Sequence, residues 1–188
     1  MSPRDLLLGS FHAALAAADP LKIVPQHLPK PPKGRTLVVG AGKAAAAMAL
    51  SVEQNWPAKA PLDGLVVTRY QHGLLTNRVT VIEAAHPVPD ERGEKAAQEI
   101  LRRVKSLTPD DLLLVLVSGG GSALLSLPVE GIAMDELKTV TRELLKCGAP
   151  IQDMNTVRKH LSAIQGGRLA AACRAQVVAL VISDVTGD

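Results

Sequence analysis

Short apolar runs alternate with longer amphipathic segments along this chain. Runs of Val, Leu and Ile four to eight residues long are bounded by Gly, Pro, Asp and Asn, which is typical of strands separated by turns. The run at 111–118 is the most continuous, and unbroken apolarity indicates a strand that is buried on both faces. The predicted strands cover residues 36–40, 62–68, 78–84, 111–118 and 176–183.

Helical periodicity fills most of the segments between these runs. Residues 4–18 predict an amphipathic helix that ends near Asp19, and residues 20–34, with five prolines, predict a connecting loop. Asp90 is placed to cap a helix, and Gly148 to terminate another. The other predicted helices cover 44–54, 94–107, 134–148 and 155–173, the last interrupted at Gly166 and Gly167.

Strands that alternate with helices predict an α/β fold. We expect a Rossmann-like, doubly wound, mostly parallel sheet with helices on both faces. With 188 residues, the chain is long enough for one domain with its own core. It stops just after the last strand, where loops of such sheets build ligand sites. We therefore expect residues 1–188 to be a fragment of a longer protein, with a second domain absent.

Composition narrows the class of protein. The net charge of +3 is small, and the chain has only one Phe, one Trp and one Tyr, which argues against a dedicated nucleic-acid binder. No apolar run reaches the roughly 20 residues of a membrane span, and no signal peptide is evident. The two cysteines lack metal-ligand spacing and are expected to be reduced. Together these features predict a cytoplasmic protein with an aliphatic core.

The first of two glycine-rich turns follows the predicted strand at 36–40. Its sequence GAGKAA at 40–45 matches the G-x-G-x-x-A pattern of a dinucleotide-binding turn. An acidic residue should then end the next strand and hold the ribose, but that strand ends at Thr68. Lys43 faces the positive end of a helix dipole, which is unfavourable unless an anion lies nearby. The alternative is a tight turn with a solvated lysine.

The second turn, SGGGS at 118–122, follows the continuous apolar run. It lacks the lysine of a Walker A loop, but consecutive glycines leave backbone N–H groups accessible to an anion. Ser118 and Ser122 can each donate a further hydrogen bond. A flexible turn without a ligand is the alternative. The predicted phosphate and nucleotide ligands are Gly40, Gly42, Ser118, Gly119, Gly120, Gly121 and Ser122.

Other polar residues are candidates for holding the substrate and a metal ion. Arg158 can clamp a carboxylate or phosphate through its planar guanidinium, with Asn155 beside it on the same helix. His86 lies at a strand end. A solvated basic helix face and a structural turn histidine are the alternatives. Asp184 and Asp188 follow the last strand, where carboxylates are natural Mg²⁺ ligands beside phosphates, although a helix cap and a turn also account for them.

Five motifs occur in an order and at spacings that resemble the class II glycerate 2-kinases, a family often named hydroxypyruvate reductase or tartrate-utilisation protein. The motifs are VVGAGKAA, HPVPDERG, LVSGGGSALL, MNTVRKHLSAIQGGRLA and SDVTGD, and the resemblance covers residues 36–188. It implies a Rossmann-like N-terminal domain, a second α/β domain and an active site between them. It also implies that Lys43 is catalytic and that residues 118–122 hold phosphate. Thr186 and Gln165 depart from the family pattern.

The resemblance implies transfer of the ATP γ-phosphoryl group to the 2-hydroxyl of D-glycerate, with Mg²⁺, to give 2-phosphoglycerate. Because the second domain is absent, the chain alone is expected to be inactive. An NAD(P)H-dependent hydroxypyruvate reductase is one alternative, favoured by the first glycine turn. A non-enzymatic domain that binds a phosphate ligand is the other. The oligomeric state, a homodimer included, stays open.

Overall fold

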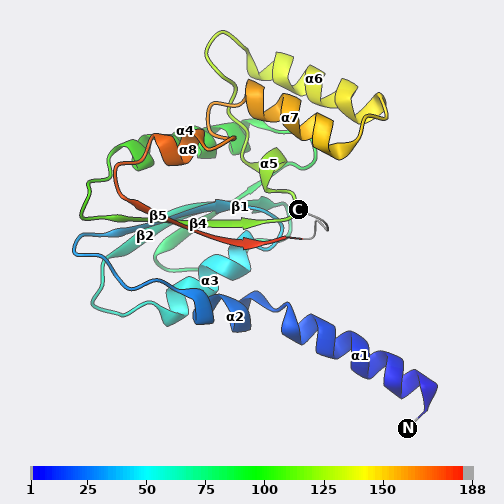
Figure 1. The fold of residues 1–188 in the computed structure, drawn as a ribbon, viewed down its shortest axis with the longest axis vertical. Helices are drawn as coiled ribbons and strands as arrows, with labels where there is room; N and C mark the ends of the chain where they lie inside the picture. The colour runs from blue at the N-terminus through cyan, green and yellow to red at the C-terminus, as the bar shows by residue number, and fades with distance from the viewer. Residues whose placement is uncertain (1, 184–188) are drawn as a thin grey trace.

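A computed structural model describes residues 2–183. Its centre is a five-stranded sheet in the order β3-β2-β1-β4-β5, and each neighbouring pair is parallel (Figure 1). The predicted α/β fold with a parallel sheet is therefore confirmed. The strands are β1 (Thr36–Ala41), β2 (Leu62–Arg69), β3 (Val79–Ala84), β4 (Leu112–Ser118) and β5 (Gln176–Ile182).

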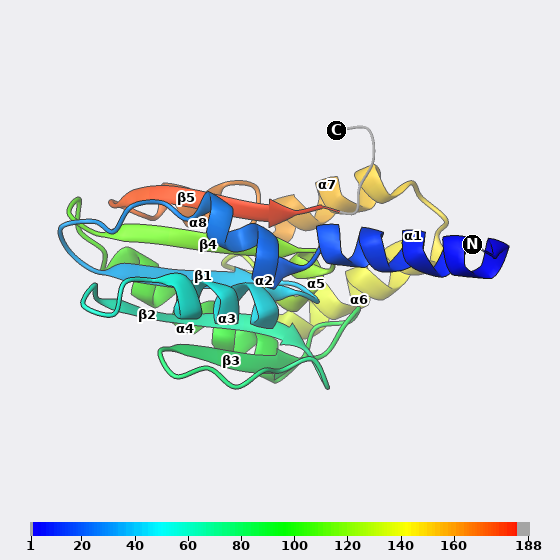
Figure 2. The same ribbon diagram turned by 90° about the horizontal axis from the view of Figure 1, so that it is seen from below.

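Helices cover both faces of the sheet. One face is covered by α3 with the short α2 and the 3₁₀-helix η1, and the other by α4, α5 and α8, while α6 and α7 lie toward the carboxyl ends of the strands (Figures 1 and 2). The helices are α1 (Pro3–Ala17), α2 (Pro20–Ile23), η1 (Val24–His27), α3 (Ala45–Asn55), α4 (Glu91–Lys105), α5 (Gly121–Leu124), α6 (Met134–Lys146), α7 (Ile151–Leu161) and α8 (Arg168–Ala171).

The chain reverses its direction across the sheet between β1 and β4. It passes from β1 to β2 through α3 on one face, and from β3 to β4 through α4 on the other, as crossovers of constant hand require. In doubly wound sheets, ligands bind at this reversal, outside the carboxyl ends of the strands. Both glycine-rich turns follow these two central strands, so the fold brings them to one place.

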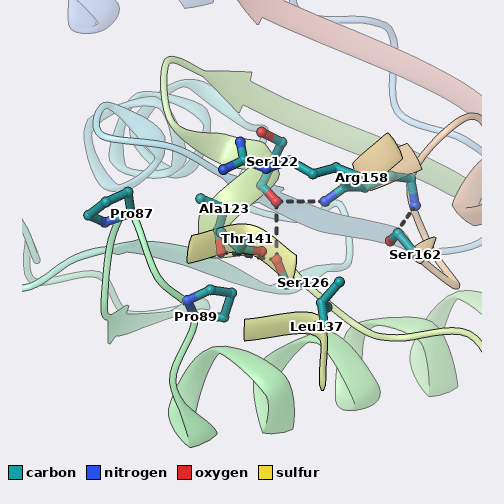
Figure 3. Close-up of a pocket in the computed structure, with 10 residues that line it drawn as sticks. Pro87, Pro89, Ser122, Ala123, Ser126, Leu137, Thr141, Arg158 and Ser162 are labelled. Carbon is teal, nitrogen blue, oxygen red and sulfur yellow. Dashed lines mark hydrogen bonds between the residues drawn. The ribbon is translucent and has the colours of Figure 1, made fainter. Parts of the chain in front are cut away.

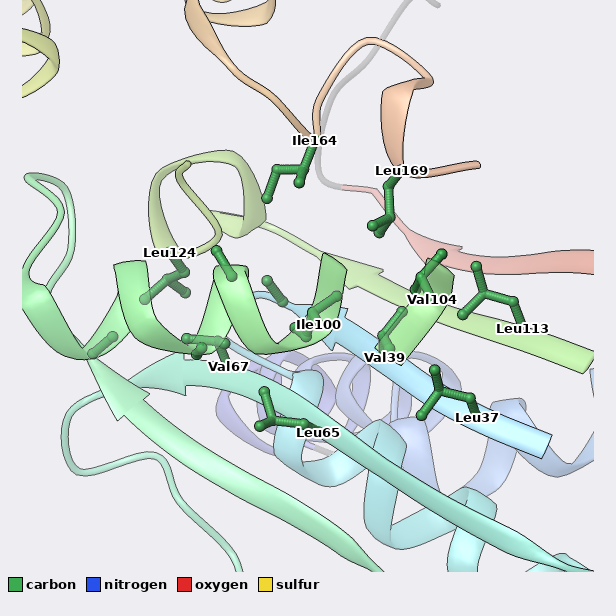
Figure 4. Close-up of a cluster of buried hydrophobic side chains, with 14 of the residues drawn as sticks. Leu37, Val39, Leu65, Val67, Ile100, Val104, Leu113, Leu124, Ile164 and Leu169 are labelled. Carbon is green, nitrogen blue, oxygen red and sulfur yellow. The ribbon is translucent and has the colours of Figure 1, made fainter. Parts of the chain in front are cut away.

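Each face of the sheet has its own apolar core. Alternate residues of β1 and β2 point to opposite sides: Leu37, Val39 and Leu65 pack under α4 (Figure 4), whereas Val38 and Val66 pack under α3. All five side chains are at most 6% exposed. Burial on both faces explains why the central strands read as continuous apolar runs, and it holds the two turns on a rigid base.

The structure confirms both predicted helix-terminal residues. The Asp90 carboxylate accepts hydrogen bonds from the backbone N–H groups of Gly93 at 2.9 Å and Ala85 at 3.1 Å, and from the Tyr70 hydroxyl at 2.7 Å. Burial alone raises the pKa of Asp90, but these hydrogen bonds outweigh it and the pKa is lowered. Gly148 follows α6 with a φ of +69°, the left-handed conformation that glycine adopts without strain.

Two predicted segments are wrong in outline. The predicted loop at 20–34 begins with α2 and η1, because Asp19 caps a new helix whose first residue is Pro20, a position that proline favours. The single helix predicted at 155–173 is two helices. Residues 162–167 between α7 and α8 are irregular, with Gly166 and Gly167 at φ values of +63° and +83°.

The N-terminal helix α1 was predicted as an amphipathic helix, and none of its residues is buried. It projects from the body of the domain (Figures 1 and 2), with Leu7 71% exposed and Phe11 58% exposed. No single helix within residues 2–183 is long and apolar enough to cross a membrane. Only the pair Pro3–Ala17 and Pro20–His27, bent by 50°, reaches that length and composition together.

Candidate active site

Hydrogen bonds join the two glycine-rich turns at the switch point. The backbone N–H of Lys43 donates to the carbonyl of Gly119 at 2.9 Å, and the N–H of Ala44 donates to the hydroxyl oxygen of Ser118 at 3.0 Å. The N–H of Gly42 is also occupied, because it donates to the Val67 carbonyl at 3.1 Å. The backbone N–H groups of the first turn therefore donate hydrogen bonds to protein atoms and are not available to a ligand.

The glycines of the first turn allow two strands and two turns to pack closely. A side chain at Gly40 would overlap the backbone carbonyl of Leu116 on β4, and one at Gly42 would overlap Ser118. Gly42 also has a φ of +140°, which other residues rarely adopt. The structure thus gives both glycines a packing role, and their predicted contact with phosphate stays a prediction.

The second turn differs from the first because some of its backbone N–H groups are not hydrogen-bonded to protein atoms within residues 2–183. Among the hydrogen bonds of residues 2–183, none is donated by the backbone N–H of Gly120 or Ser122. Gly120 has a φ of +86°, and a Cβ there would lie 2.9 Å from His86 Nε2 and 3.6 Å from Lys43 Cε. The predicted catalytic lysine, a predicted substrate ligand and the second turn therefore meet at Gly120.

A cavity of about 440 Å³ opens beside this point. His86, Asn155 and Arg158 line it together with residues 118–122, so all three predicted substrate ligands face one space. His86 comes from the loop after β3, and Asn155 and Arg158 come from α7. Side chains that are far apart in the sequence thus enclose a volume suited to a small polar ligand.

The cavity is electrostatically positive. Burial lowers the pKa of His86, and the positive charges of Lys43, Arg69 and Arg158 lower it further. Burial also lowers the pKa of the half-buried Arg158. His86 is therefore a neutral imidazole at neutral pH, surrounded by three cations. Such a site favours a ligand that carries both negative charge and hydroxyl groups.

A smaller pocket beneath the second turn shows how the turn is held (Figure 3). The Ser122 carbonyl accepts hydrogen bonds from Gln165 Nε2 at 2.6 Å and from the Ser126 hydroxyl at 3.2 Å. Gln165 also donates to the Leu125 carbonyl at 3.1 Å. Gln165, which departs from the family pattern, thus fastens α5 to the irregular segment after α7.

Arg69 was not among the predicted site residues. It ends β2 and pairs in register with Ala84 of β3, two residues before His86. Its Nε lies 2.6 Å from His72 Nε2, and its charge acts on His86. The signal was present in the sequence, because Arg69 stands at the strand end where an acidic residue was expected and absent.

The two predicted Mg²⁺ ligands lie at the C-terminal end of the sequence. Asp184 and Asp188 lie outside residues 2–183. Within the described part of the chain, no three His, Cys, Asp or Glu side chains come together in a way that could hold a metal ion. The assignment of Mg²⁺ to these two aspartates stays a prediction.

Fold and cavity together define a doubly wound α/β domain with its candidate site at the switch point. Comparison with known proteins identifies the family to which this domain belongs. Residues 6–188 match the model of a domain of unknown function, DUF4147. The chain belongs to the class II glycerate kinase family and corresponds to the family's N-terminal domain.

Relatives and solved structures agree with this placement. The chain is 44% identical to D-glycerate 2-kinase of Thermotoga maritima and 52% identical to an Agrobacterium vitis protein provisionally named hydroxypyruvate reductase. All of this chain aligns in both comparisons, with 45% and 43% of those proteins. A crystal structure of a Pyrococcus horikoshii protein has a TM-score of 0.87 at 40% identity, and one of Thermotoga maritima glycerate kinase has a TM-score of 0.85. The chain thus spans less than half the length of these relatives.

Proposed function

We propose that the protein carrying this chain transfers the γ-phosphoryl group of ATP to the 2-hydroxyl of D-glycerate, giving 2-phosphoglycerate and ADP. Kinase activity on glycerate is supported at the level of the family, since relatives across this whole chain are named glycerate 2-kinases. We propose in addition that ATP is the phosphoryl donor and that the 2-hydroxyl of glycerate is the acceptor.

The convergence at Gly120 is the observation that carries the proposal. Phosphoryl transfer depends on positioning and on stabilising the charge of the transferring group. The Cε atom of Lys43, which carries the ammonium group, lies 3.6 Å from the position of a Cβ at Gly120. Within residues 2–183, the N–H groups of Gly120 and Ser122 in the second turn have no hydrogen-bond acceptor. A cation and backbone donors directed at one point fit a phosphoryl group.

Each residue around the cavity has a chemical role in this proposal. Residues 118–122 bind phosphate oxygens, Lys43 stabilises the γ-phosphoryl as it moves, and Arg158 with Asn155 holds the glycerate carboxylate. The bond between the γ-phosphorus and the β–γ bridging oxygen breaks as the 2-oxygen of glycerate bonds to phosphorus. The hydroxyl proton passes to neutral His86 or to water. Asp184 and Asp188 are the proposed Mg²⁺ ligands, and the ion would neutralise phosphate charge.

A hydroxypyruvate reductase that uses NAD(P)H is the second candidate, because the Agrobacterium relative carries that name. Two observations disfavour it. The N–H groups of the first turn, which would hold a dinucleotide pyrophosphate, donate to protein atoms instead. Thr68, near the end of β2 where a ribose ligand is needed, is completely buried. A domain that binds a phosphate ligand without turnover is the third candidate.

One pair of assays on the complete protein separates these candidates. The first assay supplies D-glycerate, ATP and Mg²⁺, and a coupled spectrophotometric reaction measures the release of ADP. Phosphorus NMR then identifies the product as the 2- or the 3-phosphate. In the second, hydroxypyruvate is supplied with NADH. We expect 2-phosphoglycerate in the first assay and no oxidation of NADH in the second. Oxidation of NADH without formation of ADP would refute the proposal.

A further inference from the structure

A second cavity of about 460 Å³ lies next to the first, over the α4 face of the sheet. Its floor is formed by the central strands, with Val39 from β1 and Val115 from β4, and β5 contributes Val177 and Ala179. Ile164 and Leu169, which point toward the sheet in Figure 4, form its wall under α8. This space is therefore mainly apolar, with Asn155, Lys159 and Gln165 as polar residues in its lining.

The two cavities are adjacent and share part of their lining. Gly121, Ser122 and Asn155 line both of them. A ligand that fills the apolar cavity and extends past Ser122 therefore reaches the open N–H groups of the second turn. Nothing in the activity proposed above assigns this apolar space to any part of a substrate.

We propose that the apolar cavity binds the adenine base and ribose of the nucleotide, so that the triphosphate lies along residues 118–122 and glycerate occupies the cavity beside His86. This assignment rests on the proposed kinase function. The sequence left open which glycine turn holds ATP, and this proposal assigns ATP to the second.

Size and lining fit a nucleoside. Ligand pockets usually have volumes of about 300–1,000 Å³, apolar walls and a few well-placed polar groups, and this cavity has about 460 Å³. Among the described residues, the backbone N–H groups of Gly166 and Gly167 at its rim donate no hydrogen bond. A Cβ at Gly167 would meet nothing within 4 Å, so the backbone there is open to a ligand. These donors suit the ring nitrogens of a purine.

The first turn offers no comparable site. Its N–H groups at Gly42, Lys43 and Ala44 are all occupied by protein acceptors. The helix that follows it, α3, lies on the opposite face of the sheet from the apolar cavity. A nucleotide seated on the first turn would therefore lack both backbone donors and this apolar space.

Two neighbouring alanines of α8 provide a matched test. Ala170 and Ala171 are both exposed, but only Ala170 lines the cavity. In Ala170→Trp the indole should occupy the nucleoside space, whereas in Ala171→Trp the same side chain is added outside it. Dissociation constants for ATP, adenosine and inorganic tripolyphosphate are measured by calorimetry for the complete protein and both variants. Ala179→Trp, on β5 across the cavity, is a second variant that fills the space without touching α8.

We expect Ala170→Trp and Ala179→Trp to weaken ATP and adenosine about tenfold or more, and to leave tripolyphosphate unchanged. Ala171→Trp should bind all three probes like the parent protein. Unchanged affinity for ATP in both cavity variants, equal weakening of tripolyphosphate, or no binding of adenosine to the parent protein would each overturn the assignment. The reaction is scored separately: adenosine binding that depends on Ala170, without phosphorylation of glycerate, refutes the kinase proposal and leaves the nucleoside site standing.

Discussion

The two glycine-rich turns have the same context, a buried strand followed by a helix, but opposite accessibility. The first turn, at 40–45, donates its backbone N–H groups to Val67, Gly119 and Ser118. The second, at 118–122, accepts from the first and leaves N–H groups of Gly120 and Ser122 without partners among the described residues. The first is a structural turn that carries the proposed catalytic side chain, Lys43, and the second leaves backbone donors accessible to a ligand.

This difference shows that glycine-rich patterns have two distinct physical causes. A glycine is needed where two pieces of backbone come too close for a side chain, and also where a ligand must reach the backbone. The two causes produce similar sequences. Only the hydrogen-bond partners of each glycine-rich turn distinguish the two causes. The comparison is therefore tested most directly by substituting the glycines, the serines and the lysine of the two turns one at a time.

Gly40→Ala should have the largest effect, because the new methyl group would overlap the backbone of Leu116 in the central strand pair. Backbone cannot yield as a flexible side chain does, so we expect a loss of about 3 kcal/mol or more in the free energy of unfolding. The measurement is urea denaturation followed by circular dichroism. Gly9→Ala is the control, since a Cβ there meets nothing within 4 Å. Equal stability of the two variants would show that the first turn is not closely packed.

Lys43→Ala in the complete protein should lower kcat about 100-fold, equivalent to about 2.7 kcal/mol. The reason is the loss of the ammonium next to the second turn. The KM for ATP should change much less if the interaction forms chiefly in the transition state. Lys43→Arg should not restore the full rate, because a planar guanidinium does not replace a compact ammonium. A wild-type kcat in a folded Lys43→Ala protein would make Lys43 a solvated surface residue.

Gly120→Val should weaken nucleotide or phosphate binding by about 1 kcal/mol or more. A side chain there opposes the φ of +86° and approaches His86. Binding is measured by calorimetry, with circular dichroism as the check on folding. If a folded variant binds ATP as tightly as the parent protein, the second turn is not the phosphate site.

Ser118→Ala and Ser122→Ala divide the serines between the two roles. The Ser118 hydroxyl accepts from Ala44 N–H, so its removal should cost about 1 kcal/mol of folding stability. Ser122 is exposed, and within residues 2–183 its hydroxyl makes no hydrogen bond. Its removal should leave stability unchanged within about 0.5 kcal/mol and weaken phosphate binding instead. Denaturation and calorimetry on both variants measure the two effects, and a reversed pattern would contradict the division.

The smallest expected effect concerns His86 and pH. Its pKa is lowered in the folded protein by burial and by Lys43, Arg69 and Arg158, so the folded state favours the neutral ring. The unfolded state, with an ordinary pKa near 6.5, binds the proton more readily. This contribution to stability is therefore complete above about pH 6.5 and is lost as the pH falls below it. His86→Asn should reduce the pH dependence of the free energy of unfolding below about pH 6.5, measured by urea denaturation at several pH values. An unchanged pH dependence would contradict the lowered pKa of His86.

Most of the fold could be predicted from the sequence because the central strands are buried on both faces. β1 and β4 lie in the interior of the sheet, where most side chains are apolar, and so they are recognised as nearly continuous apolar runs. Segments outside this constraint were predicted less well. The break after Leu161 arises because Arg168 donates to the backbone carbonyls of Lys159 and Ser162, a tertiary contact that local periodicity does not contain.

The sequence suggested candidate site residues but not their arrangement in space. Residue types and glycine patterns identified Lys43, His86 and Arg158, which the structure places around one region of positive charge. The hydrogen bonds between the turns and the apolar cavity depend on β1 lying beside β4, and the order of strands is set by packing of the whole sheet. Arg69 was missed because its role depends on the neighbouring strand β3.

The hydrogen bond from Ala44 to Ser118 joins residues 74 positions apart in the sequence. A ribosome makes the chain from its N-terminus, so β1, β2 and β3 emerge well before β4 can close against β1. During that interval one edge of β1, a strand that is buried throughout in the folded domain, is unpaired and can associate with other chains. The feature that brings the turns together thus also imposes a vulnerable stage on biosynthesis, and the time taken to translate α4 sets its duration.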